Sequence, residues 1–489
     1  MNARNRREFL KAAGLGAAAA AVAPGCLLAG PAAAPIASDG LPPRRRPNVL
    51  FLFTDDQRED TIGALGNPHI KTPNLDRLAR EGVVFTNAYC MGGFSGAVCL
   101  PSRMMLLRGR SWFSVRSLPP DFPNLPKSVN EAGYETYHLG KRGNTDTLVH
   151  RSFTHSHYLS DDADRKSGFP CKQLADDAIA FLKTRDKSKP FFMCLAPANP
   201  HDPRIADRKY MDQYDVGKMP LPPNFKPFHP FNNGELLIRD EKLAPWPRTE
   251  AEIRRHLRDY YAVVTGMDEQ IGRLFDALKE LGEYDNTILI FSSDQGIAIG
   301  SHGLMGKQNL YEHSMGVPLI FAGPGIPKGR KADAFAYLFD VYPTICEMVG
   351  AKIPGTLEGK SLAPVIRGEK EGVRDTIFLA YRNVQRAVRR GPWKLLRYPQ
   401  VNKTQLFDLE ADPFETKDLS DNPAHAAKVK ELLALMGEQQ KLFGDTDPLT
   451  VADPKPAEAD LDFFRKPLGP AKGYGEFRKL IQEQLEARA

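Results

Sequence analysis

The chain has 489 residues, 26% of them charged and 42% hydrophobic, with a formal net charge of +6. This length exceeds one ordinary hydrophobic core and indicates two or three domains, and the composition is typical of a globular protein. Residues 1–46 hold seven Lys and Arg residues and two acidic ones, so the rest of the chain is close to neutral. A basic surface that binds nucleic acid is therefore excluded.

The N-terminus carries a targeting signal. Arg6-Arg7-Glu8-Phe9-Leu10-Lys11 precedes an alanine- and glycine-rich run to about Gly30, and together they resemble a twin-arginine export signal. The run is too weakly apolar for a permanent membrane span. Gly25-Cys26 is similar to the end of a lipoprotein cleavage box, which leaves a lipid anchor at Cys26 open. We expect a bacterial protein that the twin-arginine machinery exports to the periplasm or cell surface, with no membrane contact besides that anchor.

A buried strand and a capped helix follow the signal. After a proline-rich basic linker, residues 48–53 form an unbroken apolar run, typical of a strand buried on both faces of a parallel sheet. Asp55 and Asp56 come next, and two adjacent acids are costly there unless a cation or an arginine neutralises them. A solvated turn is the alternative. Thr72 and Pro73 then begin a helix that ends before Gly82.

One of the six cysteines precedes the next predicted helix. None of the six lies in a closely spaced pair, so neither a zinc site nor a disulfide framework is indicated. Pro101 suits the first position of a helix, which places Cys99 just outside the N-terminus, where backbone N–H groups favour an anion. Arg103 lies one turn further and can bind an oxyanion. The alternative is a small buried cysteine before an ordinary amphipathic helix.

Strands and helices alternate to about residue 350, and then the pattern changes. Further strands are predicted at 134–139, 190–196, 287–293 and 317–322, and helices at 176–183 and 251–281, with a long loop or insertion over 204–250. The C-terminal part contains a predicted hairpin at 387–398, a strand at 405–409 and helices near 424–442 and 474–487. We predict an α/β fold with a large mixed, mostly parallel sheet sandwiched by helices and a smaller C-terminal α+β domain. The predicted parts are 1–46, 47–370 and 371–489.

Chemically capable side chains follow four of the apolar runs. Ligands bind beyond the carboxyl ends of the strands in open α/β sheets, so we expect these side chains to meet there. They are Asp55-Asp56, Lys141, His201 and Asp294-Gln295.

The oxygen atoms of this set suit a hard divalent cation, calcium before magnesium. Asp55, Asp56, Asp294 and the amide of Gln295 would supply them, and the cation would polarise an oxyanion held beside it. Positively charged side chains could hold the remaining oxygens of the oxyanion and the leaving group, and a histidine can transfer protons near neutral pH. These residues are Arg103, Lys141, Lys307 and His201.

The motifs resemble those of the type I sulfatases, which are formylglycine-dependent members of the alkaline phosphatase superfamily. Cys99, Pro101, Ser102, Arg103, Leu107 and Gly109 match the signature of that family. The resemblance covers about residues 47–420. It also rests on 48–56, 72–76, 200–203, 293–296, 306–319, 340–344 and 406–413.

The resemblance implies an activity, a metal and a modification. Cys99 would be oxidised to formylglycine by a formylglycine-generating or sulfatase-maturating enzyme, and one hydroxyl of its hydrate would attack sulfur. Arg103 would stabilise that hydrate, and His201 would assist at the leaving oxygen. Lys141 and Lys307 would grip the sulfate. One calcium ion would be bound by Asp55, Asp56, Asp294, Gln295 and the modified Cys99.

Three positions depart from the family pattern. Arg108 stands where threonine is usual, and Gln295 where many relatives have Asn or His. Gly140-Lys141-Arg142-Gly143 lacks the histidine that often follows the lysine. His302 is the best placed replacement because it is close to Lys307. The other histidines that could serve are His138, His150, His155 and His157. For each of the five, an ordinary surface or loop position is the alternative, and we favour it.

We therefore expect an exported sulfatase that hydrolyses a sulfate monoester on a small molecule or glycan, with a carbohydrate as the expected substrate. One alternative is a phosphodiesterase or phosphonate monoester hydrolase of the same superfamily. Another is a protein that binds sulfated glycans without catalysis, against which the set of cations and His201 argues. In the C-terminal domain, an anionic sugar could meet Arg382, Arg389 and Arg390, and a solvated strand edge is the alternative for these three.

Overall fold

The computed structural model describes residues 45–160 and 165–459. The predicted export signal, Cys26 and the helix near 474–487 lie outside the described residues. Within the described ranges, no helix combines the length and the apolar character needed to cross a membrane. The cysteines of these ranges (Cys90, Cys99, Cys171, Cys194 and Cys346) are buried, and none of them forms a disulfide.

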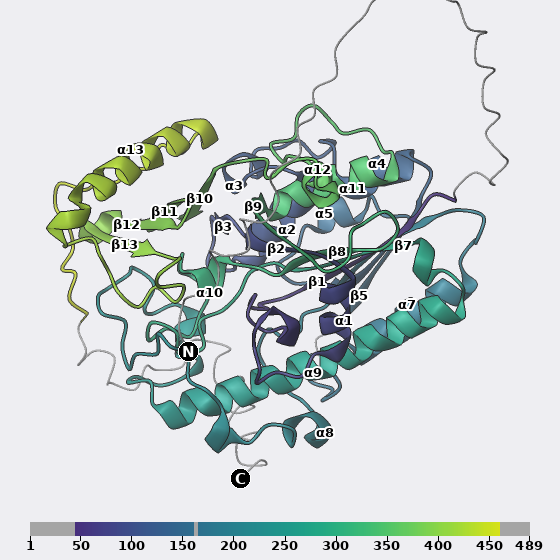
Figure 1. The fold of residues 1–489 in the computed structure, drawn as a ribbon, viewed down its shortest axis with the longest axis horizontal. Helices are drawn as coiled ribbons and strands as arrows, with labels where there is room; N and C mark the ends of the chain where they lie inside the picture. The colour runs from purple at the N-terminus through teal and green to yellow at the C-terminus, as the bar shows by residue number, and fades with distance from the viewer. Residues whose placement is uncertain (1–44, 161–164, 460–489) are drawn as a thin grey trace, which may run out of the picture. The chain divides into compact units, whose positions relative to one another are not determined.

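An eight-stranded sheet organises the described part of the chain (Figure 1). The strand order is β5-β4-β6-β1-β7-β8-β2-β9, and β8 alone runs antiparallel to its neighbours. The sheet is therefore mixed and mostly parallel, as predicted. The strands are β1 (Asn48–Thr54), β2 (Gly82–Tyr89), β4 (Glu135–Lys141), β5 (His155–Leu159), β6 (Phe191–Ala196), β7 (Thr287–Ser293), β8 (Leu319–Ala322) and β9 (Arg330–Tyr337).

Helices cover both faces of this sheet (Figure 1). Alternate side chains of β1 point to opposite faces: Leu50 and Leu52 join one core, and Phe51 and Phe53 join the other. The first core packs against α1 (Pro73–Glu81), α7 (Lys172–Thr184) and α9 (Glu250–Glu280). The second packs against α2 (Cys99–Arg108), α4 (Leu125–Glu131) and α11 (Val341–Val349).

A smaller sheet follows toward the C-terminus, with α13 (Ala426–Phe443) packed against it. Its order is β13-β12-β11-β10-β3, and β3 comes from the loop just before Cys99. The sheet thus ties the C-terminal part to the loop that leads into α2. Its strands are β3 (Gly92–Gly93), β10 (Thr376–Tyr381), β11 (Gln385–Arg390), β12 (Trp393–Tyr398) and β13 (Lys403–Asp408).

Short helices complete the fold. The insertion over 204–250 is mostly irregular, as predicted, and contains α8 (Arg208–Met211) and two 3₁₀ turns. The other short α-helices are α3 (Trp112–Val115), α5 (Thr147–His150), α10 (Glu312–Met315) and α12 (Ala363–Arg367). The 3₁₀ helices are η1 (Gly63–Leu65), η2 (Val216–Lys218), η3 (Arg239–Leu243), η4 (Tyr284–Asn286), η5 (Leu338–Asp340), η6 (Pro399–Val401) and η7 (Pro423–His425).

The start of one helix and the N-terminal cap of another differ from the prediction. Helix α2 begins at Cys99 itself, because Val98 already has helical φ and ψ of −56° and −25°. Pro101 fits two positions later, since the N–H groups of the whole first turn lack partners within the helix. Helix α1 begins after Thr72 as expected, but the Thr72 side chain does not cap the helix. Asp268 of α9 does so, accepting hydrogen bonds from the backbone N–H groups of Asn74 at 3.0 Å and Leu75 at 2.8 Å.

Candidate active site

The predicted site residues converge beyond the carboxyl ends of four adjacent parallel strands. Thr54 and Ser293 are register partners on β1 and β7, and the Asp294 N–H donates to the Thr54 carbonyl at 3.1 Å. On the other side of β1, the Asp55 N–H donates to the Asn199 carbonyl at 3.0 Å, which brings the loop after β6 alongside. Lys141 is the last residue of β4. The shared register therefore brings the side chains of these strands to one edge of the sheet.

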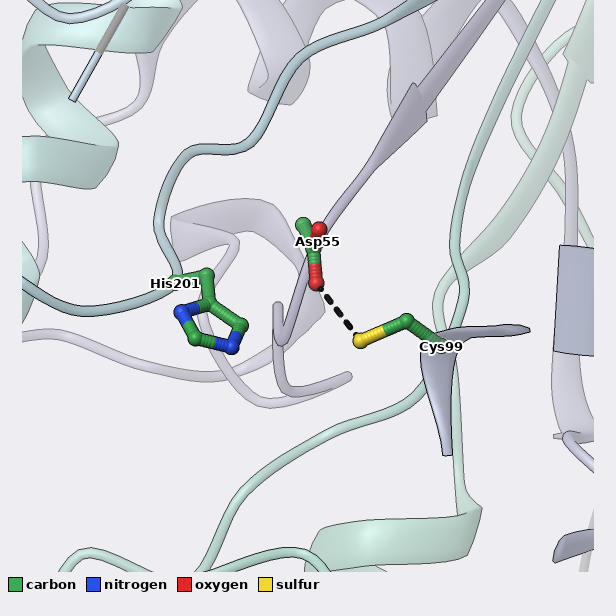
Figure 2. Close-up of side chains that lie close together, drawn as sticks. All are labelled: Asp55, Cys99 and His201. Atoms are coloured by element: carbon green, nitrogen blue, oxygen red, sulfur yellow. Dashed lines mark hydrogen bonds between the residues drawn. The ribbon is translucent and has the colours of Figure 1, made fainter. Parts of the chain in front are cut away.

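Cys99 lies at the centre of this group and is 1% exposed. Its Sγ donates to Asp55 Oδ1 at 3.2 Å, and a ring nitrogen of His201 lies within 4.8 Å of the Cys99 sulfur and an Asp55 oxygen (Figure 2). Gln295 Nε2 and Lys307 Nζ donate to the same Sγ at 3.1 and 3.2 Å. Burial and the Asp55 carboxylate together raise the pKa of the Cys99 thiol well above its usual value, against the pull of the nearby lysines. The thiol is therefore neutral and a poor nucleophile.

Two cations hold the carboxylates of Asp55 and Asp294. Lys141 forms an ion pair with Asp55, and Arg103 contacts Asp55 with Nη2 at 3.4 Å and Asp294 with Nε at 3.1 Å. Burial raises the pKa of Asp55, but the charges of Lys141 and Arg103 outweigh it and hold that pKa well below its usual value. Burial and the neighbouring Asp55 raise the pKa of Asp294 to about 7. Burial is the larger of these two causes, and the charges of Arg103 and Lys141 offset it only in part.

Asp56 completes the acidic group from a strained backbone position. Its φ is 62°, in the left-handed region that a non-glycine residue rarely adopts. Tyr260 of α9 holds this conformation by donating to the Asp56 carbonyl at 2.7 Å, and the Asp56 N–H donates to Asp294 Oδ1 at 3.0 Å. The carboxylate accepts hydrogen bonds from Lys307 at 2.7 Å and from Gln295 Nε2 at 2.6 Å. This backbone conformation directs the Asp56 carboxylate toward Cys99 and Lys307.

His201 lies at the open side of the site. Its Nε2 is 3.7 Å from Asp56 Oδ2, and 15% of its side chain is exposed. The side chains of Arg103, Lys141 and Lys307 are 8% exposed or less. The His201 ring is oriented by its neighbour, since Nδ1 lies 2.8 Å from the Asp202 carbonyl oxygen. His201 is therefore the most solvent-accessible of these four side chains.

The buried oxygens fit a hard cation. Asp55, Asp56, Asp294 and Cys99 each offer one ligand atom, and these atoms all lie within 4.8 Å of one another. Gln295 Oε1 is buried and has no hydrogen-bond partner in the described structure. Rotating this amide by 180°, which exchanges atoms of similar size, would place the oxygen between Asp56 and Cys99. Three carboxylates and an amide oxygen form the donor set that Ca²⁺ or Mg²⁺ prefers.

Several supporting residues were missed by the sequence analysis. Ser102 of the signature donates through Oγ to the Asp294 carbonyl at 2.7 Å, which joins α2 to the loop after β7. Arg239 forms an ion pair with Asp202, the residue that orients His201. The position of Ser102 inside the motif was the only available signal. Arg239 and Tyr260 carried none, because their contacts span 37 and 204 residues of sequence.

None of the five histidines considered as a replacement is among the residues that contact Cys99, Asp55 or Asp56 in the described structure. The ring of His302 is buried and stacks on Tyr311 with 3.9 Å between ring centroids. The rings of His138 and His150 contact each other in a tilted arrangement with 3.8 Å between ring centroids, and burial lowers the pKa of both. His155 pairs with Glu135 at 2.9 Å, and the ring of His157 lies against Tyr137.

The three arginines considered for a sugar subsite have different environments. Arg389 is largely buried and pairs with Glu312 at 3.1 Å, so it is a structural residue. Arg382 pairs with Glu235 at 2.6 Å and Arg390 with Asp375 at 3.8 Å, and both keep 44% of their side chains exposed. Arg390 is solvated beside an exposed acid, but it is the last residue of β11, an inner strand of the sheet, and not part of an edge strand.

Fold and site together define an α/β enzyme whose buried carboxylates and cations surround one side chain at a sheet edge. Residues 47–351 match the family model described as Sulfatase, and residues 300–441 match the C-terminal region of N-sulphoglucosamine sulphohydrolase. The chain belongs to the sulfatase family and is a sulfuric ester hydrolase. The family resemblance predicted from the motifs is thereby confirmed.

Relatives and solved structures support this assignment. The N-acetylglucosamine-6-O-sulfatase of Bacteroides thetaiotaomicron is 29% identical over 83% of this chain and 88% of that protein. A solved structure in complex with its substrate, D-glucosamine-2-N,6-O-disulfate, is 27% identical with a TM-score of 0.70, over 83% of this chain and 99% of that one. The phosphonate monoester hydrolase of Agrobacterium radiobacter has the same fold, with a TM-score of 0.70 at 23% identity, over 81% and 96% of the two chains.

Proposed function

We propose that this chain is an exported sulfatase that removes a sulfate monoester from a carbohydrate, using formylglycine at position 99 and one calcium ion. The observation that carries the proposal is the convergence of Cys99 with Asp55, Asp56 and Asp294 within 4.8 Å in a buried site. Export is supported by residues 6–30 of the sequence. Fractionation of cells that express the full chain tests it, and retention in the cytoplasm would contradict it.

The state of Cys99 supports the modification. Its thiol is neutral because burial and Asp55 raise its pKa, so an unmodified side chain supplies little nucleophile. Formylglycine in its hydrated form would supply a hydroxyl nucleophile at the same place. Lys307 donates to this position, and Arg103 lies beside it through its contacts with Asp55 and Asp294. They would orient the oxygens of the modified side chain and stabilise negative charge there.

Asp55, Asp56 and Asp294 would hold the cation, and the lysines would hold the sulfate. When bound, the cation would polarise oxygen atoms and increase their acidity. The Lys141 ammonium pairs with Asp55, and the Lys307 ammonium pairs with Asp56. A sulfate oxygen can accept hydrogen bonds from either ammonium. His201 lies toward solvent, where it would give a proton to the leaving oxygen of the sugar. The sulfate thus enters the buried end, and the alcohol leaves past His201.

The mass of the peptide that contains Cys99 tests the modification. We expect formylglycine, as aldehyde or hydrate, in protein produced together with a formylglycine-generating or sulfatase-maturating enzyme. Protein produced without that enzyme should contain the thiol and should have little activity. An unmodified thiol in a fully active preparation would contradict the mechanism.

A matched pair of sugar esters tests the substrate class. The names of the relatives specify sulfated amino sugars, which supports a sulfated carbohydrate here. We expect kcat/KM for glucosamine 6-sulfate, or for another sulfated sugar of the same screen, to exceed kcat/KM for the corresponding phosphate ester by at least about 10²-fold. Each tenfold step in this ratio corresponds to about 1.4 kcal/mol of transition-state preference. A preference for phosphate or phosphonate esters would support the alternative that the shared fold with phosphonate monoester hydrolase leaves open.

A further inference from the structure

The loop that carries Lys307 is held by residues of the 204–250 insertion. Lys307 itself is 2% exposed, and its ammonium lies between Asp56 and Cys99. The two residues before it donate their backbone N–H groups to one carboxylate: Met305 to Glu241 Oε2 at 3.0 Å and Gly306 to Oε1 at 2.9 Å. A single side chain 66 positions upstream therefore fixes the backbone that leads into Lys307.

Arg248 fixes that carboxylate in turn. Its Nη2 donates to Glu241 Oε2 at 2.7 Å and to the Glu241 carbonyl at 2.8 Å, and its side chain is 0% exposed. Its Nε donates to the Gly303 carbonyl at 3.4 Å, in the same loop as Lys307. The guanidinium stacks over the Trp246 ring at 3.5 Å. The Glu241–Arg248 ion pair is therefore buried, and both of its members form hydrogen bonds with the loop.

The residue after Lys307 is bound to the same segment. Gln308 Nε2 donates to Asp240 Oδ2 at 2.6 Å and to the Gly96 carbonyl at 2.8 Å, three residues before Cys99. The packing is close, because a Cβ on Gly306 would lie 2.5 Å from Gln308 Oε1 and 2.9 Å from the Asp240 Cβ. Residues 239–248 thus hold the Lys307 loop against the Cys99 loop.

Stability alone does not account for a buried ion pair of this kind. Replacing such a pair by apolar residues is often neutral or stabilising, because the desolvation of both charges offsets their attraction. A lysine ammonium on its flexible stem, however, needs a fixed backbone to act at a defined point. From these contacts we propose that Glu241 and Arg248 are positioning residues that orient Lys307 for catalysis. This inference rests on the role proposed above for Lys307.

The proposal predicts a loss of kcat that depends on Lys307. Arg248→Met and Glu241→Gln should each lower kcat by about 10²-fold, the loss expected when a catalytic group moves by about 1 Å. KM should rise by no more than it does in Lys307→Ala, because both residues act on the bound sulfate only through Lys307. Arg248→Lys keeps the charge without the planar contacts and should recover part of the activity. In a Lys307→Ala background, Arg248→Met should cause no further loss of kcat.

Arg185→Met is the matched control for the buried charge. Arg185 is also 0% exposed and pairs at 2.6 Å with Glu283, which the Asn48 amide contacts at the start of β1, the opposite end of the strand from the site. This variant should lose stability without losing kcat in its folded fraction. If Arg248→Met does not fold, the kcat of Glu241→Gln tests the proposal instead. The glutamine side chain keeps the volume of the glutamate and one hydrogen-bond acceptor.

Two results separate this inference from the proposed function. Full activity of Lys307→Ala would overturn the role of Lys307 and with it the inference. An inactive Lys307→Ala beside an Arg248→Met or Glu241→Gln enzyme with normal kcat would overturn the inference alone. Additive losses in the double variant would overturn it too, because the effect would then not pass through Lys307.

Discussion

Replacing Cys99 with alanine is expected to lower kcat/KM for a sulfated sugar on the order of 10⁴-fold or more, the loss typical of removing a nucleophile from a preorganised site. The variant keeps the surrounding cations and carboxylates but has no side chain that can become an aldehyde. Because the lost Sγ is small and buried, the fold should persist with a cost near that of a small cavity. Steady-state kinetics and the thermal unfolding midpoint measure the two effects.

Cys346→Ala is the control for the loss of a buried thiol. Cys346 is 0% exposed on α11 and lies in the core on the α2 face of the sheet. Its replacement should cost similar stability and leave kcat/KM close to that of the unchanged chain. If Cys99→Ala retained activity comparable to Cys346→Ala, position 99 would not carry the nucleophile.

Removing divalent cations is expected to lower kcat by at least about 10²-fold and to destabilise the protein, because the carboxylates of Asp55, Asp56 and Asp294 then lack their common counter-ion. Re-addition of Ca²⁺ at 100 times its Kd should restore about 2.7 kcal/mol of stability. That corresponds to a rise of a few degrees in the unfolding midpoint. Ca²⁺ should act at lower concentration than Mg²⁺, because a crowded set of carboxylate and amide oxygens suits the larger ion.

Asp294→Asn tests whether the cation binds where the carboxylates meet. The variant keeps the shape but loses the charge of the carboxyl whose pKa is raised to about 7. The Ca²⁺-dependent shift in the unfolding midpoint should disappear in this variant. Without Ca²⁺, its unfolding midpoint should fall by less than that of a variant with a cavity in the hydrophobic core. An unchanged Ca²⁺ response in this variant would place the ion elsewhere.

The candidate site could be predicted because its residues stand at positions with a physical meaning. Asp55, His201 and Asp294 each follow an apolar strand, and parallel strands that share a register bring their carboxyl ends together. Cys99 and Arg103 are one helical turn apart, so they face the same way wherever the helix begins. The error of two residues in the start of α2 therefore left both side chains at the site.

The supporting contacts could not be predicted from these patterns. The 204–250 insertion was described as a loop over one face, and nothing local in it distinguishes Glu241 or Arg248 from solvated charges. Their contacts with residues 303–306 join segments that only the complete fold brings together. The same reason explains why the stacking of His302 on Tyr311, instead of a place beside Lys307, was not foreseen.

The amino-acid sequence by itself determined the family, the sheet-based architecture and the groups that meet at its edge. Buried strands and motif residues are local patterns, and their chemistry follows from short-range rules. Only the tertiary structure decided the antiparallel direction of β8, the strained backbone of Asp56 and the ion pair that fixes the Lys307 loop. Strand direction, backbone strain and buried charge depend on contacts between distant segments, and such contacts exist only once the chain has folded.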